Sequence, residues 1–409
     1  MKILFLSDNF PPEVNAPASR TIEHCREWVR AGHEVTVITC APNFPAGKLF
    51  AGYRNQWRSI EHVDGIKVIR VWSFIAPNTG VIGRLIDYLS FMTSAILAGM
   101  FVARPDIIVA TSPQFFTACA GRVLGTLRRR PWIFELRDLW PDSVSAVGAM
   151  RESFGLRAFR KLELHLYRHC RGVVSVTESF REHLIVRGIA AEKIEVVTNG
   201  ADLTRFAPRE RDRDLARSLS LEGKFVAGYV GTHGLAHGLE TLLDAADALR
   251  RLPDGDRFRI VLLGDGARKA HLKAMAAERG LHNVLFLDLV SKDQVPRYWS
   301  LLDLSIIHLN PNELFKSVIP SKLFECMAMG IPLLHGVLGE SAEIVRREGF
   351  GVVFQPGDSA QLARHIVELA QDPSRLAELR SAGILAAPRY DRDRLAAKML
   401  AALDGWAPR

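Results

Sequence analysis

The stretch that does most to decide the fold lies at residues 320–332 and reads PSKLFECMAMGIP. Its Pro-Ser pair is a helix start signal, and the Gly-x-Pro ending stops the helix. Lys322 and Glu325 are three residues apart, so they share one face of the first turn. A helix start with a lysine suits a phosphate, and a glutamate accepts hydrogen bonds from sugar hydroxyls. The pattern predicts a nucleotide-sugar site, and a solvated ion pair is the alternative.

Length and composition describe a basic globular chain. Its 409 residues suffice for two or three domains, and its net charge of +8 indicates anionic partners such as nucleic acid, acidic lipid or phosphorylated substrates. The five cysteines are scattered and form no CxxC pair. This usage argues for a reducing compartment and against a disulfide framework or a zinc site. The N-terminal apolar run is too short for a signal peptide, so the cytoplasm is the expected compartment.

Short apolar runs alternate with helical stretches in both halves of the chain. Continuous apolar strands joined by helices predict a buried parallel sheet. The alternation breaks at Asn199 and restarts at Phe225, so we expect an α/β fold of two tandem, Rossmann-like, doubly wound domains. The expected strands are Lys2–Ser7, Glu34–Thr39, Lys67–Trp72, Asp106–Thr111, Trp132–Leu136, Gly172–Thr177, Ile194–Thr198, Phe225–Val230, Phe258–Leu263, Val284–Leu287, Leu304–His308, Pro332–His335 and Gly351–Phe354.

Four segments make up the expected domain organisation. Residues 1–205 form the N-terminal domain, and residues 223–385 form the C-terminal domain. The charge-rich stretch 206–222 is expected to be a solvated linker. A last segment, 386–409, is expected to contain a helix that returns to the N-terminal domain.

Glycine-rich turns follow the first two strands of the C-terminal domain. The first reads GTHGLAHG at residues 231–238, and glycine there lets the backbone approach a ligand closely. Its two histidines could suggest a metal, but no HExxH and no third ligand accompany them, so no metal is expected. The second turn lacks the third glycine of a dinucleotide fingerprint, so NAD is not expected. The candidate donor-binding residues in these turns are Gly231, Thr232, His233, His237 and Gly264.

Charged residues also follow a strand of the N-terminal domain. The run ELRDLWPDS begins at Glu135, and Arg137 and Asp138 come at the carboxyl end of the strand. Open α/β sheets bind ligands at that end. Both residues are therefore site candidates, and a structural Arg–Asp pair that braces the loop is the alternative.

Two segments indicate a membrane surface. Tyr88–Ala103 contains sixteen residues without charge, which is short of the ~20 that span a bilayer. Leu156–Arg171 reads as a helix with five basic residues on one stripe and apolar residues, Leu162 among them, on the other. Such a face attracts anionic lipid, and an ordinary solvated face is the alternative. Nucleic acid is not expected, because no aromatic stacking platform accompanies the charge.

Taken in order along the chain, six further motifs and the stretch 320–332 resemble glycosyltransferase family 4, whose members are retaining enzymes of GT-B architecture. The chain looks most like the branch that builds O-antigen and capsule repeats, which includes N-acetyl-L-fucosamine transferases. The resemblance implies two Rossmann-like domains that face each other across a cleft. The motifs are FPPE at 10–13, GHEVTV at 32–37, RDLWP at 137–141, VTNGAD at 197–202, GDG at 264–266, NVLF at 283–286 and the stretch 320–332.

The resemblance also implies roles for residues. The second acid of the family's E-x7-E motif falls at Glu325, as a ribose ligand, whereas the first falls at Ser317, which is a departure. The family's usual arginine and lysine align with Thr232 and His237. Positive charge for the diphosphate would then come from Lys322, with His233 or His237 helping. Other expected donor contacts are the helix start at Ser321 and Leu323 and the backbone N–H groups of Asn15 and Ala16.

The expected activity is metal-independent transfer of a hexosyl or N-acetylhexosaminyl group from a UDP-sugar to a lipid-linked, polyprenyl-type glycan. The enzyme would lie at the inner face of the cell membrane, with Arg137, Asp138 and Lys322 as catalytic residues. Positive charge would stabilise the leaving diphosphate. Two alternatives stay open, a UDP-sugar epimerase of the same architecture and a non-catalytic partner subunit of a glycosyltransferase.

Overall fold

A computed structural model describes residues 1–44, 47–75, 81–140 and 154–408. The chain divides into two compact units. The first comprises Met1–Asn199 together with Arg392–Arg409, and the second comprises Gly200–Asp391. The first unit is therefore made from both ends of the chain, whereas the second is one continuous segment.

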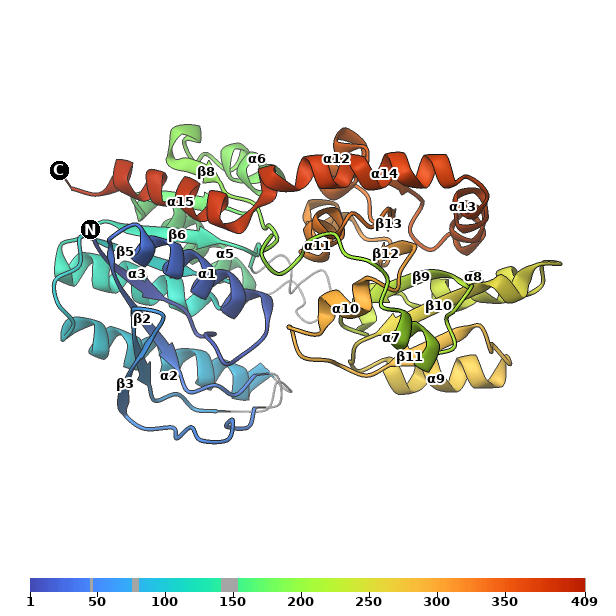
Figure 1. Ribbon diagram of the computed structural model, residues 1–409. Coiled ribbons are helices and arrows are strands. Elements are labelled where there is room, and N and C mark those ends of the chain that lie inside the picture. The colour runs from blue at the N-terminus through green and yellow to red at the C-terminus, as the bar shows by residue number, and fades with distance from the viewer. Residues whose placement is uncertain (45–46, 76–80, 141–153, 409) are drawn as a thin grey trace. The chain divides into compact units, whose positions relative to one another are not determined.

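The first unit contains an eight-stranded sheet (Figure 1). Its strands are β1 (Lys2–Leu6), β2 (Glu34–Cys40), β3 (Arg58–Val63), β4 (Ile66–Val71), β5 (Ile107–Thr111), β6 (Trp132–Leu136), β7 (Gly172–Ser175) and β8 (Ile194–Val196). Their order is β3-β4-β2-β1-β5-β6-β7-β8. All neighbours pair in parallel except β3 and β4, which are antiparallel.

Helices cover both faces of this sheet. They are α1 (Ala16–Arg30), α2 (Val81–Met100), α3 (Phe115–Arg128), α5 (Phe154–His169), α6 (Glu178–Val186) and α15 (Arg392–Trp406). Alternate residues of β1 point to opposite faces, as the strand period of two requires. Phe5 packs with Trp28 and Met399 on the face of α1 and α15. Leu6 belongs to the core on the face of α2, α3, α5 and α6.

The second unit has a six-stranded parallel sheet in the order β11-β10-β9-β12-β13-β14. Its strands are β9 (Phe225–Val230), β10 (Phe258–Leu263), β11 (Val284–Leu287), β12 (Leu304–His308), β13 (Leu333–Gly336) and β14 (Gly351–Val353). Its helices are α7 (Arg213–Ser218), α8 (Glu240–Arg250), α9 (Lys269–Glu278), α10 (Val295–Trp299), α11 (Lys322–Met329), α12 (Glu340–Glu348), α13 (Ser359–Gln371) and α14 (Pro373–Ala386).

This sheet, too, lies between two helical layers. Residues of α7, α10, α11 and α12 share one core with it, in which Phe324 and Trp299 are buried. Residues of α8, α9 and α13 share the core on the other face. The fold is α/β throughout, with two doubly wound Rossmann-like units, as the sequence predicts.

Three features differ from the expected organisation. The edge strand β3 was not predicted, because Arg58–Val63 is half exposed and polar along its length. The stretch 206–222 belongs to the second unit and is not a free linker, since Leu215 and Ala216 of α7 lie in its core. The segment 386–409 does contain a helix that returns to the first unit, but only from Arg392, where α15 begins.

Each sheet has one point at which the strand order reverses direction. In the first unit this switch point lies between β1 and β5, and in the second it lies between β9 and β12. Ligands of open α/β sheets bind outside the carboxyl ends of the strands at such points. The loops after these four strands are therefore the places to examine for a site.

Candidate functional site

In the second unit, the loops after β9 and β10 meet at a glycine junction. Gly231 and Gly264 both have φ near +144°, a backbone that side chains rarely adopt. A Cβ at Gly264 would overlap the carbonyl oxygen of Gly231, and one at Gly266 would lie 2.6 Å from that of His233. Lys269 fixes the second loop, because its ammonium donates to the Gly264 carbonyl at 2.7 Å. The glycines thus let two backbones touch at the carboxyl edge of the sheet.

Lys322 projects into this junction from the first turn of α11. Its Nζ lies 3.9 Å from the ring centroid of Tyr229, and a Cβ at Gly231 would overlap it. Burial lowers the pKa of Lys322 to about 8, although Glu325 acts in the opposite direction. A cation held over an aromatic face beside a glycine turn is available to an anionic ligand. Lys322 therefore lies beside the turn at which the sequence analysis expects a diphosphate.

The start of α11 differs in detail from the expectation. Ser321 already has helical backbone angles, and its side chain forms no capping hydrogen bond. The N–H of Leu323 donates to the Pro320 carbonyl at 3.0 Å, and the Leu323 side chain is buried in the core. Leu323 therefore cannot donate to a phosphate without losing this bond. Ser317, at the place of the missing acid, donates its hydroxyl to the Leu314 carbonyl at 2.9 Å.

Burial favours the neutral form of the two histidines of the first turn, so in the free protein the positive charge of this junction rests on Lys322. Burial lowers the pKa of His233 and of His237 to about 4, and Lys322 adds to both shifts. The ring of His233 is fully buried, and neither of its nitrogens has a hydrogen-bond partner among the described residues. Nδ1 of His237 is likewise unpartnered there. Both rings can offer hydrogen bonds, but at neutral pH they add no charge.

His308 and Asn310, at the end of β12, complete this site and were not predicted. His308 Nδ1 lies 2.7 Å from the His237 carbonyl, and its Nε2 accepts from Gly357 N–H at 2.9 Å. Asn310 donates to the Leu235 carbonyl at 2.7 Å. These bonds hold the short helix Leu235–His237 against the neighbouring strand across the switch point. Only the strand order, which a single sequence does not state, brings β12 beside β9.

In the first unit, Arg137 follows β6 at the carboxyl edge of the sheet. Its N–H and that of Asp138 both donate to the Ser112 hydroxyl, at 2.7 and 3.3 Å. Burial lowers the pKa of Arg137 to about 10, against the opposing effects of Glu135 and Asp8. Its buried Nη1 has no partner among the described residues. Pro141, which ends the motif, lies outside the described residues.

The bracing pair of this loop is not Arg137 with Asp138. Arg20 of α1 forms it with Glu135, at 2.8 Å, and both side chains are buried. Arg20 also donates to the carbonyls of Val197 and Thr198, at 2.9 and 2.8 Å. The guanidinium therefore ties together α1, β6 and the segment after β8, with one hydrogen bond from each of its three nitrogens.

Asn15 is the N-cap of α1, and its side chain accepts from Ala18 N–H at 2.9 Å. The same side chain donates to Asn9. Ala16 is the first residue of the helix, so its N–H has no carbonyl one turn earlier to bond. The backbone of these two residues is thus placed as the sequence analysis expected, beside the loop that follows β1.

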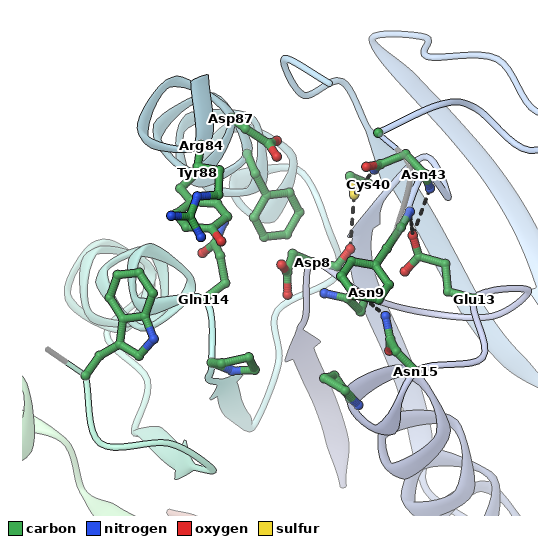
Figure 2. Close-up of a pocket in the computed structure, with 16 residues that line it drawn as sticks. Asp8, Asn9, Glu13, Asn15, Cys40, Asn43, Arg84, Asp87, Tyr88 and Gln114 are labelled. Carbon is green, nitrogen blue, oxygen red and sulfur yellow. Dashed lines mark hydrogen bonds between the residues drawn. The ribbon is translucent and has the colours of Figure 1, made fainter. Parts of the chain in front are cut away.

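A cavity of about 200 Å³ opens at the switch point of the first unit (Figure 2). Its volume is below the ~300–1,000 Å³ of pockets for drug-sized ligands, so it suits a single small polar group such as one sugar ring. Residues from the loops after β1, β2, β5 and β6 and from α2 line it. They include Asp8, Asn9, Glu13, Asn15, Asn43, Arg84, Asp87, Tyr88, Gln114 and Trp140.

Carboxyl groups dominate this cavity. Burial, with Asp8 adding to it, raises the pKa of Asp87 to about 7. Burial also raises the pKa of Asp8 and of Glu13, and Glu13 accepts from the N–H groups of Asn43 and Phe44 at 2.8 and 2.9 Å. A carboxyl group with a pKa near 7 can both donate to and accept from a sugar hydroxyl. The cavity therefore suits a polyhydroxylated ligand better than an anionic one.

The two segments expected at a membrane surface have outward apolar and basic side chains. No helix in the described part of the chain has the length and hydropathy that crossing a bilayer needs. On α2, Leu85, Ile86, Leu89 and Leu97 are exposed, and Phe101 just beyond it is 79% exposed. On α5 the basic stripe is exposed except for the half-buried Arg160. Leu162 is also exposed, contrary to expectation, because Glu163 and Tyr167 occupy the buried side.

Among the described residues, no three His, Cys, Asp or Glu side chains cluster so as to hold a metal ion.

The expected site residues fall into two groups, one in each unit. Gly231, Thr232, His233, His237, Gly264, Ser321, Lys322, Leu323 and Glu325 belong to the second unit, and Asn15, Ala16, Arg137 and Asp138 belong to the first.

Two doubly wound units, with a phosphate-compatible junction in the second and a polar cavity in the first, fit the GT-B class of glycosyltransferases. Comparison with known proteins shows the family. A glycosyl transferase 4-like domain matches residues 15–200, and a glycosyl transferases group 1 domain matches residues 210–402. The chain belongs to glycosyltransferase family 4.

Relatives extend along most of the chain. WcaI of Escherichia coli K12, provisionally assigned as a colanic acid biosynthesis glycosyl transferase, is 30% identical over 342 residues, which are 81% of this chain and 82% of WcaI. A GDP-mannose-dependent alpha-mannosyltransferase of Mycobacterium tuberculosis is 24% identical over 88% of this chain and 85% of its own.

Solved structures share the fold. Alr3699/HepE of Anabaena in complex with UDP-glucose superposes with a TM-score of 0.73 at 20% identity, covering 99% of this chain and 100% of that one. A trehalose-6-phosphate protein of Escherichia coli bound with UDP-2-fluoro glucose gives a TM-score of 0.75 at 12% identity over the full length of both chains. At these identities the likeness concerns the fold alone.

Proposed function

We propose that the chain is a retaining, metal-independent glycosyltransferase. It would transfer a hexosyl or N-acetylhexosaminyl group, with N-acetyl-L-fucosaminyl as one candidate, from a UDP-sugar to a lipid-linked glycan. The bond between the anomeric carbon and the diphosphate breaks, the acceptor hydroxyl forms the new bond on the same face, and its proton leaves with the diphosphate. Surface polysaccharide synthesis is the setting that the similarity to WcaI supports.

The observation that carries the proposal is the position of Lys322 at the glycine junction. Charge grows on the diphosphate oxygens as the glycosidic bond breaks, and a fixed cation there stabilises the transition state. Lys322 lies 3.9 Å from the Tyr229 ring at the carboxyl edge of β9. It supplies this charge from the protein, with the N–H groups of Ser321 and Lys322 at the start of α11 beside it. Glu325, one turn further on, would bind the ribose hydroxyls.

The acceptor would bind in the first unit. The cavity with Asp8 and Asp87 takes hydroxyl groups, and Arg137 and Asp138 stand at the same edge of the sheet. Arg137, with an unpartnered buried Nη1, would orient the acceptor or the transferred sugar. A cavity lined by three carboxyl groups favours a neutral acceptor sugar over a uronic acid or a sugar phosphate.

The outer side of α2 and α5 would contact the inner face of the cell membrane. Exposed leucines on α2 and Phe101 provide apolar contact, and Arg157, Lys161 and Arg168 provide positive charge. Each basic residue near an anionic leaflet contributes about 1 kcal/mol. Such contact would bring the enzyme to an acceptor that the membrane holds through its lipid.

The test is nucleotide binding and turnover of the purified protein and of Lys322→Ala. Thermal shift against UDP, GDP and ADP identifies the base, because a ligand of the folded state raises the midpoint. The relatives and neighbours are described with both GDP and UDP donors, so both are included. We expect a shift with UDP, loss of most turnover in Lys322→Ala, and unchanged activity in EDTA. Wild-type turnover of that variant would contradict the role of Lys322.

The same preparation separates the alternatives. Release of UDP from a UDP-sugar only when acceptor is present supports transfer. An epimerase would interconvert two UDP-sugars without acceptor. A non-catalytic subunit would bind nucleotide weakly or not at all and would need a second chain for activity.

A further inference from the structure

A second pocket, of about 500 Å³, lies at the opposite edge of the first unit's sheet. It lies beside Trp132 and Arg171, where β6 and β7 begin, whereas Arg137 follows the carboxyl end of β6. Its walls are the end of α3, the turn into β6 and the turn from α5 into β7. The lining residues are Arg122, Gly125, Thr126, Arg129, Arg130, Pro131, Trp132, His169, Cys170 and Arg171.

Positive side chains line this pocket, and negative ones do not. Four arginines line it and no carboxylate does. None of the four forms an ion pair with an Asp or Glu within the described ranges of the chain. The Nε atoms of Arg122 and Arg130 are buried, and neither has a hydrogen-bond partner among the described residues. Cations held close together without counter-charge repel one another, and a bound anion relieves that repulsion.

The backbone around the pocket is held in place. The N–H of Arg171 donates to the Trp132 carbonyl at 2.9 Å, and the Trp132 indole donates to the His169 carbonyl at 3.1 Å. The N–H of Arg130 donates to the Gly125 carbonyl at 3.0 Å. The guanidinium groups therefore extend from a rigid frame. Planar guanidinium forks fit the oxygens of a phosphate in paired hydrogen bonds.

We propose that this pocket is a phosphate-binding site built by Arg122, Arg130 and Arg171, separate from the site of sugar transfer. Its ligand is a phosphate group, either a free phosphate or the headgroup phosphate of an anionic phospholipid. This pocket is independent of the proposed reaction, because it lies at the other edge of the sheet and shares no residue with the expected catalytic set.

Two probes distinguish the two sources. Inorganic phosphate is titrated by calorimetry against the full chain, with chloride at equal ionic strength as reference. Vesicles of phosphatidylcholine, with and without phosphatidylglycerol, are used in co-sedimentation. Calorimetric binding assigns free phosphate, whereas binding only to the phosphatidylglycerol vesicles assigns a lipid headgroup.

The variants compared are Arg122→Gln/Arg130→Gln and the control Arg54→Gln/Arg58→Gln. Both remove two charges, but the control removes them from exposed side chains at and before β3, which belong neither to this pocket nor to the outer side of α2 and α5. We expect the first to weaken phosphate or vesicle binding at least fivefold and the control to change it less than twofold. Arg171→Gln, on an exposed side chain, repeats the test should the double variant not fold.

UDP binding should stay unchanged in all of these variants, which keeps the result independent of the transferase proposal. Equal losses in the pocket variant and the control would overturn the site in favour of diffuse surface charge. Binding to neither probe would also overturn it.

Discussion

At the scale of single residues, burial of Lys322 bears on its proposed role as the cation of the donor site. The pKa of an exposed lysine is about 10.4, whereas burial lowers the pKa of Lys322 to about 8. The free site therefore holds a cation whose solvation is already partly lost. In the proposed donor site, an entering diphosphate would restore the lost stabilisation, which would favour binding of the most highly charged part of the donor.

This pKa predicts the pH dependence of nucleotide binding. Lys322 is charged below its pKa of about 8 and neutral above it, so affinity for UDP should be level up to pH 7.5 and fall above pH 8. The fall approaches tenfold per pH unit if binding needs the charged form. Calorimetry from pH 6.5 to 9.5 measures it. In Lys322→Arg the fall should disappear from this range, and a level profile in the wild type would contradict the assignment.

Glu325 allows a sharper test of the ribose contact. Glu325→Ala should bind UDP about tenfold more weakly, since about 1.4 kcal/mol of hydrogen bonding is lost. It should bind 2′,3′-dideoxyuridine diphosphate as the wild type does, because that ligand lacks the hydroxyls. Calorimetry of both proteins with both ligands completes the cycle. An equal loss for the two ligands would show that Glu325 acts elsewhere.

At the scale of elements, the glycine junction explains how two strand ends can share one site. The loops after β9 and β10 approach so closely that only hydrogen atoms fit between them. Gly264→Ala should therefore cost about 3 kcal/mol or more of unfolding free energy, from backbone strain at φ +143° and overlap with Gly231.

Gly280→Ala is the matched control for this substitution. Its φ is +63°, yet nothing lies within 4 Å of an added Cβ, so strain alone should cost about 1 kcal/mol. Urea unfolding of both variants gives the comparison. Equal midpoints would mean that the close approach is not needed.

How deeply an element is buried decides whether the sequence predicts it. Fully buried strands such as Ile107–Thr111 can be predicted from the sequence, because each is a short, continuous apolar run. The half-exposed β3 and the charge-rich α7 carry no such signal.

Gly231 and Lys322 could be predicted from local patterns, whereas His308 and Asp87 join their sites only through strand order and helix packing. Asp8, directly after β1, could have been found by the same reasoning that found Arg137.

At the scale of the whole molecule, buried neutral histidines make stability depend on pH. Burial lowers the pKa of His233 to about 4 and that of His335 to about 3, while both titrate near 6.5 when unfolded. Between these values the unfolded state binds more protons, so folding loses free energy as the pH falls below 6.5. The loss at pH 5 is about 2 kcal/mol for each.

Hydrogen exchange, corrected for intrinsic rates, measures this loss separately in the two units. The second unit should lose stability from pH 7 to pH 5, and His335→Gln should lose less over the same range. In the first unit the raised pKa values of Asp8 and Asp87 act in the opposite direction, because the folded state there binds the proton more readily. A second unit whose exchange does not change with pH would contradict the burial of neutral rings.

The division of the chain also has a consequence for its synthesis. Leu395, Met399 and Leu403 of α15 pack in the same core as Phe5 and Trp28, so residues from both ends of the chain complete one core. A ribosome makes α15 only after it has made the second unit. Until then part of the first unit's core stays uncovered, and a chaperone has an interval in which to bind it. A chain that stops before Arg392 would lack the residues that close this core, so its first unit should unfold more readily than that of the full chain.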